Sequence, residues 1–100
     1  MPTILTTVPP DAGADLARLL VEERLAACVN RIDCRSTYWW DGSVHEEPEI
    51  ILLAKTDPEN VGGLVDTIEA EHPHQTPCIE RFDEDVLVRA YEQWRDEATL

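Results

Sequence analysis

The pattern of apolar and polar positions at the start of the chain predicts a strand followed by a helix. Residues 3–8 are mostly β-branched, and Pro9-Pro10 cannot donate ladder hydrogen bonds, so we expect a strand that ends there. Asp11 is then placed to cap a helix of about residues 11–24. Its apolar side chains recur at helical spacing, at Leu16, Leu19 and Leu20.

A long β-hairpin is expected next. Residues 28–40 show no helical period, and Asp41-Gly42 is a pair that favours a type I′ hairpin turn before a second strand of residues 43–56. An uninterrupted register would pair Trp40 with Ser43, Tyr38 with His45, Cys34 with Glu49 and Cys28 with Lys55. Pro48 cannot donate to the ladder, so we expect a bulge at that position.

The second half of the chain predicts a helix, a short strand and a terminal helix. Asp57-Pro58 is a helix start, and apolar side chains continue from it at helical spacing as far as His72. Residues 78–82 alternate as a strand does, and Asp83 is placed to cap the terminal helix. The expected buried stripe of that helix is Leu87, Ala90, Tyr91, Trp94 and Ala98.

The order of these elements, β-α-β-β-α-β with a terminal helix, predicts an α+β ferredoxin-like sandwich with an extended hairpin. Strands of about 13 residues reach roughly 43 Å, whereas helices of about 14 residues cover roughly 21 Å, so the hairpin tip should extend beyond its helices. Its edges carry apolar side chains, namely Tyr38, Trp39, Trp40, Val44 and Ile50. Unpaired apolar edges recruit other chains, so we expect a homo-oligomer whose hairpins pair between subunits.

Composition narrows the class of protein. The 100 residues are 43% hydrophobic and 29% charged, which suits one small globular domain, residues 1–100. No apolar run has the length of a membrane span, and the N-terminus lacks the features of a secretory signal, so we expect a cytoplasmic protein. The three cysteines form no C-x-x-C pair and leave an odd thiol, which favours free, reduced cysteines.

The charge balance limits the partners. Twenty-one acidic and eight basic residues give a net charge of −13, which argues against binding to nucleic acid or to anionic membranes. The only lysine is Lys55, and the other basic residues are arginines. This bias is typical of proteins from a salt-rich cytoplasm, where a Debye length of about 3 Å screens self-repulsion. We therefore interpret the acidic excess as halophilic.

Two side chains and one loop are candidates for binding a metal ion or an anion. Lys55 ends an apolar strand, where it either reaches solvent or provides a cation for an anionic ligand. Cys28 is either a small core side chain or a soft ligand for Cu(I) or zinc, and a neighbouring Lys55 would favour its thiolate. His72, His74 and Cys78 place three donors in one loop, at a spacing that matches no established zinc motif.

Several short motifs resemble those of the CutA family of divalent-cation tolerance proteins. They are Ala-Ala-Cys-Val-Asn at residues 26–30, Tyr-x-Trp-x-Gly at 38–42, Leu-x-x-Lys-Thr at 52–56 and Tyr-x-x-Trp at 91–94. The loop at 72–78 is similar to the family pattern His-Pro-Tyr-Glu-x-Pro-Glu but departs from it at His74, Gln75 and Cys78. These departures replace an aromatic ring and two carboxylates by an imidazole, an amide and a thiol.

The resemblance implies a trimer of PII-like plan with a ligand-binding cleft between subunits. It assigns seven residues to that cleft: Cys28, Asn30, Trp40, Lys55, His72, His74 and Trp94. Cys28, His72 and Cys78 are then the candidate ligands of a copper or other divalent ion.

Two functions remain open from the sequence. The first is a trimer that binds or responds to divalent metal ions through these ligands. The second is a PII-like signalling or scaffold trimer that binds a small anionic metabolite near Lys55 and a protein partner. No G-x-S-x-G motif, Gly-rich phosphate loop or His-Asp-Ser set is present, so we do not expect an enzyme.

Overall fold

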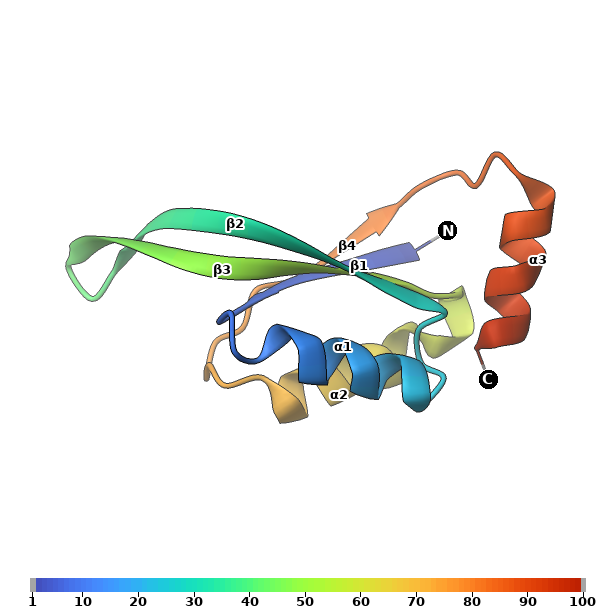
Figure 1. Cartoon of the computed structure of the whole chain (residues 1–100), viewed down its shortest axis with the longest axis horizontal. Helices are drawn as coiled ribbons and strands as arrows, with labels where there is room; N and C mark the ends of the chain where they lie inside the picture. The colour runs from blue at the N-terminus through green and yellow to red at the C-terminus, as the bar shows by residue number, and fades with distance from the viewer. Residues whose placement is uncertain (1, 100) are drawn as a thin grey trace.

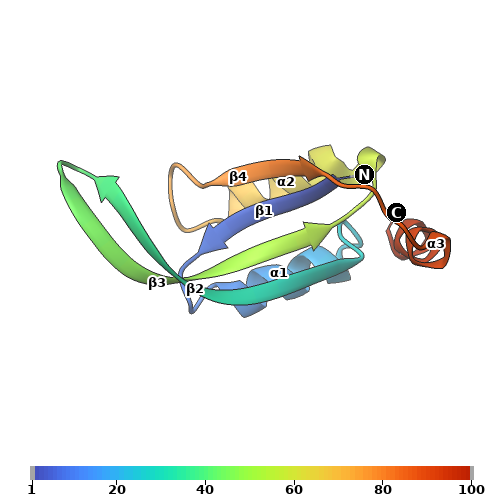
Figure 2. The same cartoon turned by 90° about the horizontal axis from the view of Figure 1, so that it is seen from above.

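The computed structural model describes residues 2–99 as an α+β fold of the predicted ferredoxin-like kind. Its elements are β1 (Pro2–Val8), α1 (Gly13–Glu22), β2 (Cys28–Trp40), β3 (Ser43–Lys55), the short 3-10 helix η1 (Pro58–Asn60), α2 (Val61–Glu71), β4 (Ile79–Asp83) and α3 (Arg89–Ala98). The strands form one antiparallel sheet in the order β2-β3-β1-β4, with α1 and α2 on one face (Figures 1 and 2). None of the helices in this part of the chain is long and apolar enough to cross a membrane.

The core lies between the sheet and the pair α1 and α2. Alternate residues of the two central strands point into it, and Ile4, Val8, Leu52 and Ala54 are each at most 1% exposed. The helices cover these strands with leucine and isoleucine side chains at helical spacing, namely Leu16, Leu20, Leu64 and Ile68. We call the face of the sheet that points away from α1 and α2 the open face.

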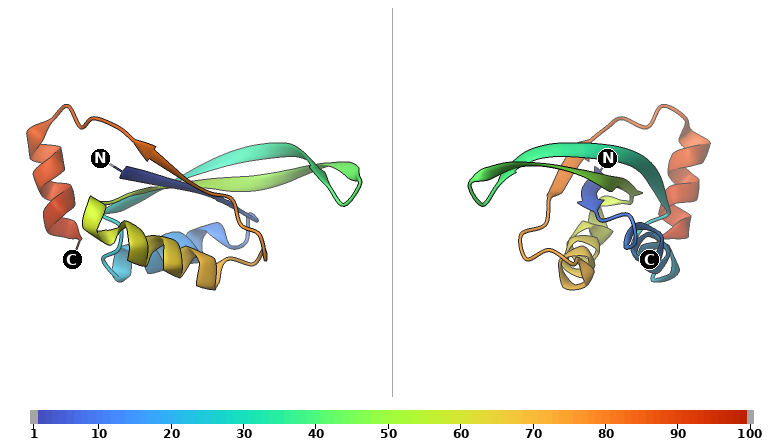
Figure 3. Two further views of the ribbon diagram at one scale, coloured as in Figure 1. Left: turned by 180° about the vertical axis from the view of Figure 1, so that it is seen from behind. Right: turned by 60° about the vertical axis from the view of Figure 1, so that its left-hand side comes forward.

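The β2-β3 hairpin has the predicted register along its whole length, including the pairs Cys28 with Lys55 and Cys34 with Glu49. Asp41 and Gly42 have φ angles of 51° and 82°, and two positive values are what a type I′ turn requires. The tip extends from one end of a molecule whose longest dimension is 46 Å (Figure 3).

The bulge expected at Pro48 is absent, so that prediction was wrong. Pro48 pairs directly with Arg35 in an unbroken ladder. The pairing of β1 with β3 ends at Ile50, so within residues 2–99 the partner of β3 at Pro48 is β2 alone. Proline fits an unbroken register where its nitrogen faces the unpaired side of a strand.

The predicted helix starts are confirmed at one position and wrong at another. Asp57 caps η1, since its carboxylate accepts hydrogen bonds from the backbone N–H groups of Glu59 and Asn60. At α1 the N-cap residue is Ala12, without a side-chain hydrogen bond, so Asp11 is not the cap.

The start and the buried face of α3 also differ from the prediction. Asp83 is the last residue of β4, and the N-cap residue of α3, which begins at Arg89, is Val88. Leu87 is 92% exposed and Trp94 is 46% exposed, whereas Arg95 is 1% exposed. The apolar stripe of α3 is therefore not packed into the core of its own chain.

Thr6 provides a test of the core. Its side chain is fully buried, and its hydroxyl group has no hydrogen-bond partner among the described residues. We expect Thr6→Val to raise the free energy of unfolding by about 1 kcal/mol, because valine keeps the shape and removes the desolvated hydroxyl group. Urea denaturation measures the change, and Thr37→Val on an exposed strand position is the matched control. A clear loss of stability in Thr6→Val would contradict this account.

Candidate functional site

Strand alternation places several predicted site residues together on the open face. Ala54 points into the core, so its neighbour Lys55 points to the open face. Cys28 pairs directly with Lys55, and Asn30 pairs with Leu53, so both share that face. The half-buried Cys28 thiol lies 3.9 Å from Oδ1 of Asn30, to which it donates a long hydrogen bond. One end of the sheet therefore carries a thiol, an amide and an ammonium group.

α3 brings two aromatic side chains to the same end. Lys55 Nζ lies 5.8 Å from the centre of the Tyr91 ring, near the outer limit of a cation-π contact. The Trp94 ring lies one helical turn further on, with its centre 5.5 Å from that of Tyr91. Within residues 2–99 no carboxylate forms an ion pair with Lys55, although the chain has 21 acidic residues. We call Cys28, Asn30, Lys55, Tyr91 and Trp94 the Lys55 cluster.

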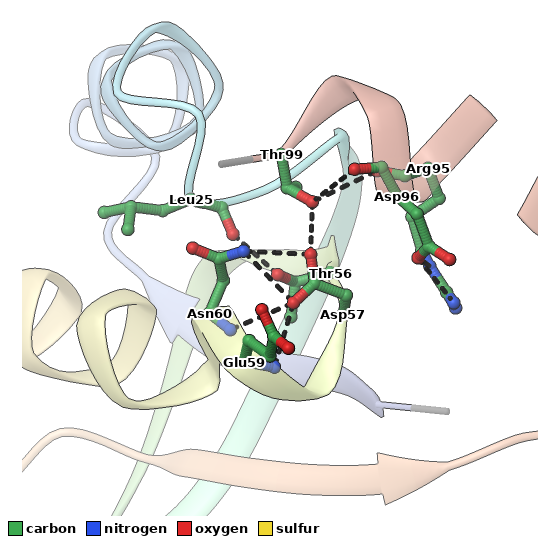
Figure 4. Close-up of polar contacts among 8 residues, drawn as sticks. All are labelled: Leu25, Thr56, Asp57, Glu59, Asn60, Arg95, Asp96 and Thr99. Atoms are coloured by element: carbon green, nitrogen blue, oxygen red, sulfur yellow. Dashed lines mark hydrogen bonds and ion pairs between the residues drawn. The ribbon is translucent and has the colours of Figure 1, made fainter. Parts of the chain in front are cut away.

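The last turn of α3 is attached to the rest of the fold by hydrogen bonds that the sequence did not reveal. The Asp57 carboxylate accepts a hydrogen bond from the Thr99 hydroxyl group in addition to those from η1 (Figure 4). Arg24 donates to the backbone oxygens of Glu97 and Ala98, at 3.0 and 3.2 Å. The Asp57 cap was readable as a local motif, but no pattern in the sequence connects positions 24, 57 and 99.

These contacts also set the charge of Asp57. Partial burial raises the pKa of its carboxyl group, but the hydrogen bonds from Thr99, Asn60 and Glu59 together outweigh this effect, and the pKa lies below its ordinary value. Asp57 is therefore a carboxylate at neutral pH. A charged acceptor strengthens each hydrogen bond that it receives.

His72 lies away from the Lys55 cluster, at the end of α2. Its side chain is buried, Nε2 is 2.8 Å from the backbone oxygen of Thr7, and Nδ1 accepts a hydrogen bond from the backbone N–H of His74 at 3.0 Å. Because Nδ1 accepts, the ring carries its proton on Nε2 and donates it to Thr7. A metal ion at His72 would have to displace one of these two hydrogen bonds.

The predicted metal ligands Cys28, His72 and Cys78 do not converge within one chain. Residues 2–99 contain no group of three or more His, Cys, Asp or Glu side chains that could hold a metal ion. The Cys78 thiol lies 3.4 Å from a carboxylate oxygen of Glu80. Partial desolvation, this hydrogen bond and neighbouring acidic charges raise the pKa of the Cys78 thiol, which disfavours the thiolate that a metal requires. A site built from these three residues needs more than one chain.

Trp40 lies at the hairpin tip, where it is 58% exposed. The tip and α3 are at opposite ends of the molecule (Figure 3). One chain therefore brings together Cys28, Asn30, Lys55 and Trp94 of the predicted cleft. Trp40, His72 and His74 lie elsewhere.

Comparison with known proteins identifies the family. The family model for the CutA1 divalent ion tolerance protein matches residues 2–98. The divalent-cation tolerance protein CutA of Thermus thermophilus is 40% identical over 98 residues, covering 96% of this chain and 95% of that protein. The PII-like protein CutA from Nostoc sp. PCC 7120, solved in apo form, superposes with a TM-score of 0.95 at 34% identity, over 100% of this chain and 98% of that one. The periplasmic divalent cation tolerance protein CutA from Archaeoglobus fulgidus gives 0.92 at 31% identity, over 98% of both chains. The chain thus belongs to the CutA family of divalent-ion tolerance proteins.

Proposed function

We propose that this chain is a non-enzymatic, homotrimeric protein that binds copper or another divalent ion at a cleft between subunits, with Cys28 as the essential ligand. The observation that carries the proposal is a free, half-buried thiol on the open face, at a sheet end that also carries the Asn30 amide. A thiolate is a soft ligand that selects copper or zinc. The tolerance of divalent ions named in the family supports this class of ligand.

The trimer is supported by surface that one chain leaves uncovered. On the hairpin, Trp39 is 74% exposed, Val44 is 52% exposed and Ile32 is 44% exposed. The open face adds half-buried apolar side chains of the central strands, such as Leu5 and Leu53. Long apolar edges and faces of this kind are stable in water when another chain covers them.

The proposed trimer is also needed to complete the metal site, because one chain supplies a single thiol, that of Cys28, to the Lys55 cluster. In the proposed cleft the further metal ligands come from another subunit. Cys78 and His72 are the residues that we predict for this role. Cys78 is the less constrained of the two, since it is exposed, whereas His72 is buried and hydrogen-bonded at both ring nitrogens.

A second candidate function is a PII-like trimer that binds a small anion and a protein partner. The observation that favours it is Lys55, whose ammonium group has an aromatic neighbour and no carboxylate partner within residues 2–99. We place either function in the cytoplasm of a salt-rich cell, which the free cysteines and the net charge of −13 support.

Replacing Cys28 by serine is expected to weaken Cu(I) binding to the reduced trimer at least about tenfold, because the hydroxyl group cannot replace a thiolate ligand. Competition titration with a chromophoric Cu(I) chelator measures the affinity. Cys34→Ser is the matched control, since Cys34 lies on the same strand and face and should matter little. Wild-type affinity should also fall as the pH is lowered, because protons compete for the thiolate.

Unchanged Cu(I) affinity in the Cys28→Ser trimer would refute the assignment of Cys28 as a metal ligand. The second candidate function, binding of a small anion, would then be favoured. Calorimetric titration of wild type and of Lys55→Gln with nucleotides then tests the second candidate directly. Heat of binding that disappears in Lys55→Gln supports it, and the absence of binding to wild type removes nucleotides as the ligand.

A further inference from the structure

The two ends of α3 are attached to the molecule very differently. At the C-terminal end, Arg24 donates to two backbone oxygens of the last turn, and Thr99 donates to Asp57. Thr99 is itself 6% exposed. We call Arg24, Asp57 and Thr99 the C-terminal anchor. The positive Arg24 side chain also lies at the negative end of the helix dipole, which adds to the attraction.

The N-terminal end of α3 carries apolar side chains that one chain leaves largely uncovered. Val88, the N-cap residue, is 62% exposed, and Leu87 before it is 92% exposed. Residues 84–88 form neither helix nor strand. Within one chain, this segment therefore holds the start of α3 with no regular secondary structure, in contrast to the hydrogen-bonded C-terminal end.

The contact with Lys55 is made at the N-terminal end of α3. Tyr91 is in the first turn of α3, and its ring lies over the Lys55 ammonium group at a distance that gives only a weak cation-π attraction. This weak contact cannot by itself fix the helix. The position of Tyr91 and Trp94 is therefore determined mainly by attachments further along α3.

We propose that the C-terminal anchor positions α3 as a movable cover over Lys55, and that releasing the anchor uncovers Lys55. Arg24, Asp57 and Thr99 are then positioning residues that act through Tyr91. The proposal about the cover stands on the geometry of one chain. Its consequence for ligand binding rests on the second candidate function, in which Lys55 receives the ligand.

The charged groups around the anchor are consistent with this role. Arg95 is buried and pairs with the exposed carboxylate of Asp96, and both lie on the same turn of α3 as the atoms that Arg24 contacts. Asp57 is the acceptor shared by Thr99 and by the backbone N–H groups of η1. Loss of the Thr99 hydroxyl group would leave the Asp57 cap of η1 intact, so the anchor can be opened without removing that cap.

Thr99→Val tests the proposal in the full-length protein, because it keeps the side-chain shape and removes the hydroxyl group that donates to Asp57 and lies 3.2 Å from the backbone oxygen of Arg95. Thr67→Val on α2 is the matched control, since Thr67 makes no side-chain hydrogen bond among the described residues. Two measurements are made on each variant. Hydrogen exchange with mass spectrometry follows residues 89–98 against residues 61–71, and acetylation follows the chain's only lysine, Lys55.

We expect Thr99→Val to speed exchange in α3 and acetylation of Lys55 at least about tenfold, because it removes a hydrogen bond to a charged group, and to leave exchange in α2 unchanged. Arg24→Gln should show the same pattern more weakly. If Thr99→Val keeps the wild-type rates of hydrogen exchange in α3 and of Lys55 acetylation, the proposal is overturned. Faster exchange in α2 and α3 together would also overturn it, because the anchor would then support the whole fold rather than the cover.

These measurements use no ligand, so failure of the metal or anion assignments cannot be confused with failure of the cover. If nucleotides bind wild type, Thr99→Val should change their affinity while Thr67→Val does not. Faster acetylation without a change in affinity would confirm the cover and contradict its role in binding.

Discussion

Shortening the hairpin tip is expected to convert the proposed trimer into monomers or into aggregates. Deleting residues 39–40 together with 43–44 removes two pairs of the ladder and leaves Tyr38 and His45, which already pair, on either side of the same turn. An even number of pairs preserves the alternation of hydrogen-bonded and non-hydrogen-bonded pairs. The deleted segments include three exposed apolar side chains, Trp39, Trp40 and Val44. Because the proposed subunit contact depends on this edge, the mass measured by light scattering should fall from three chains to one.

The controls separate the loss of contact from the loss of fold. Asp41→Asn keeps a type I′ turn and the full hairpin length, so it should remain trimeric. The shortened variant should retain far-UV circular dichroism of an α+β fold, since its core between the sheet and α1 and α2 is untouched. A shortened variant that stays trimeric would place the interface elsewhere, and a monomeric wild type would contradict the trimer itself.

The hairpin shows how much of this fold the sequence could predict. An alternating pattern and the pair Asp41-Gly42 determine the register, because a slip of one residue would turn every side chain to the other face. The bulge at Pro48 was predicted because proline interrupts a ladder. Whether it does so depends on which side of the strand its nitrogen faces, and that depends on where β1 stops pairing, which is a property of the whole sheet.

α3 shows what the sequence could not predict. Its apolar stripe predicted a core-facing helix, but the described chain leaves Leu87 and Trp94 exposed and buries Arg95. Helical periodicity identifies which side chains share a face and not which surface receives that face. The bond between Asp57 and Thr99 joins residues far apart in sequence, so no local pattern could predict it.

The candidate site was predictable where it follows from the register. The pairing of Cys28 with Lys55 came from counting residues across the turn, and it is confirmed. The approach of Tyr91 to Lys55 depends on the placement of α3 and was not predicted. The hydrogen bonds at both ring nitrogens of His72 were also outside the reach of sequence, because they join α2 to β1 and to the following loop.

Raising the salt concentration is expected to stabilise the protein strongly. A net charge of −13 on 100 residues repels itself in the compact state, and the proposed trimer would add repulsion between chains. Between about 0.1 and 2 M KCl the Debye length falls from about 10 Å to below 3 Å, so most of this repulsion is screened. A gain of about 2 kcal/mol would raise Tm by roughly 10 °C for a domain of this size.

The same titration at lower pH distinguishes screening from a general effect of salt on apolar surfaces. At about pH 4.5, near the ordinary carboxylate pKa values, protonation reduces the net negative charge and with it the repulsion that salt can screen. Strengthened apolar burial would persist at that pH, whereas screening would largely disappear. Calorimetric melting curves at both pH values, at equal protein concentration, measure the difference. A Tm that is unchanged or lower in 2 M KCl at neutral pH, where the Debye length is below about 3 Å, would contradict the halophilic interpretation.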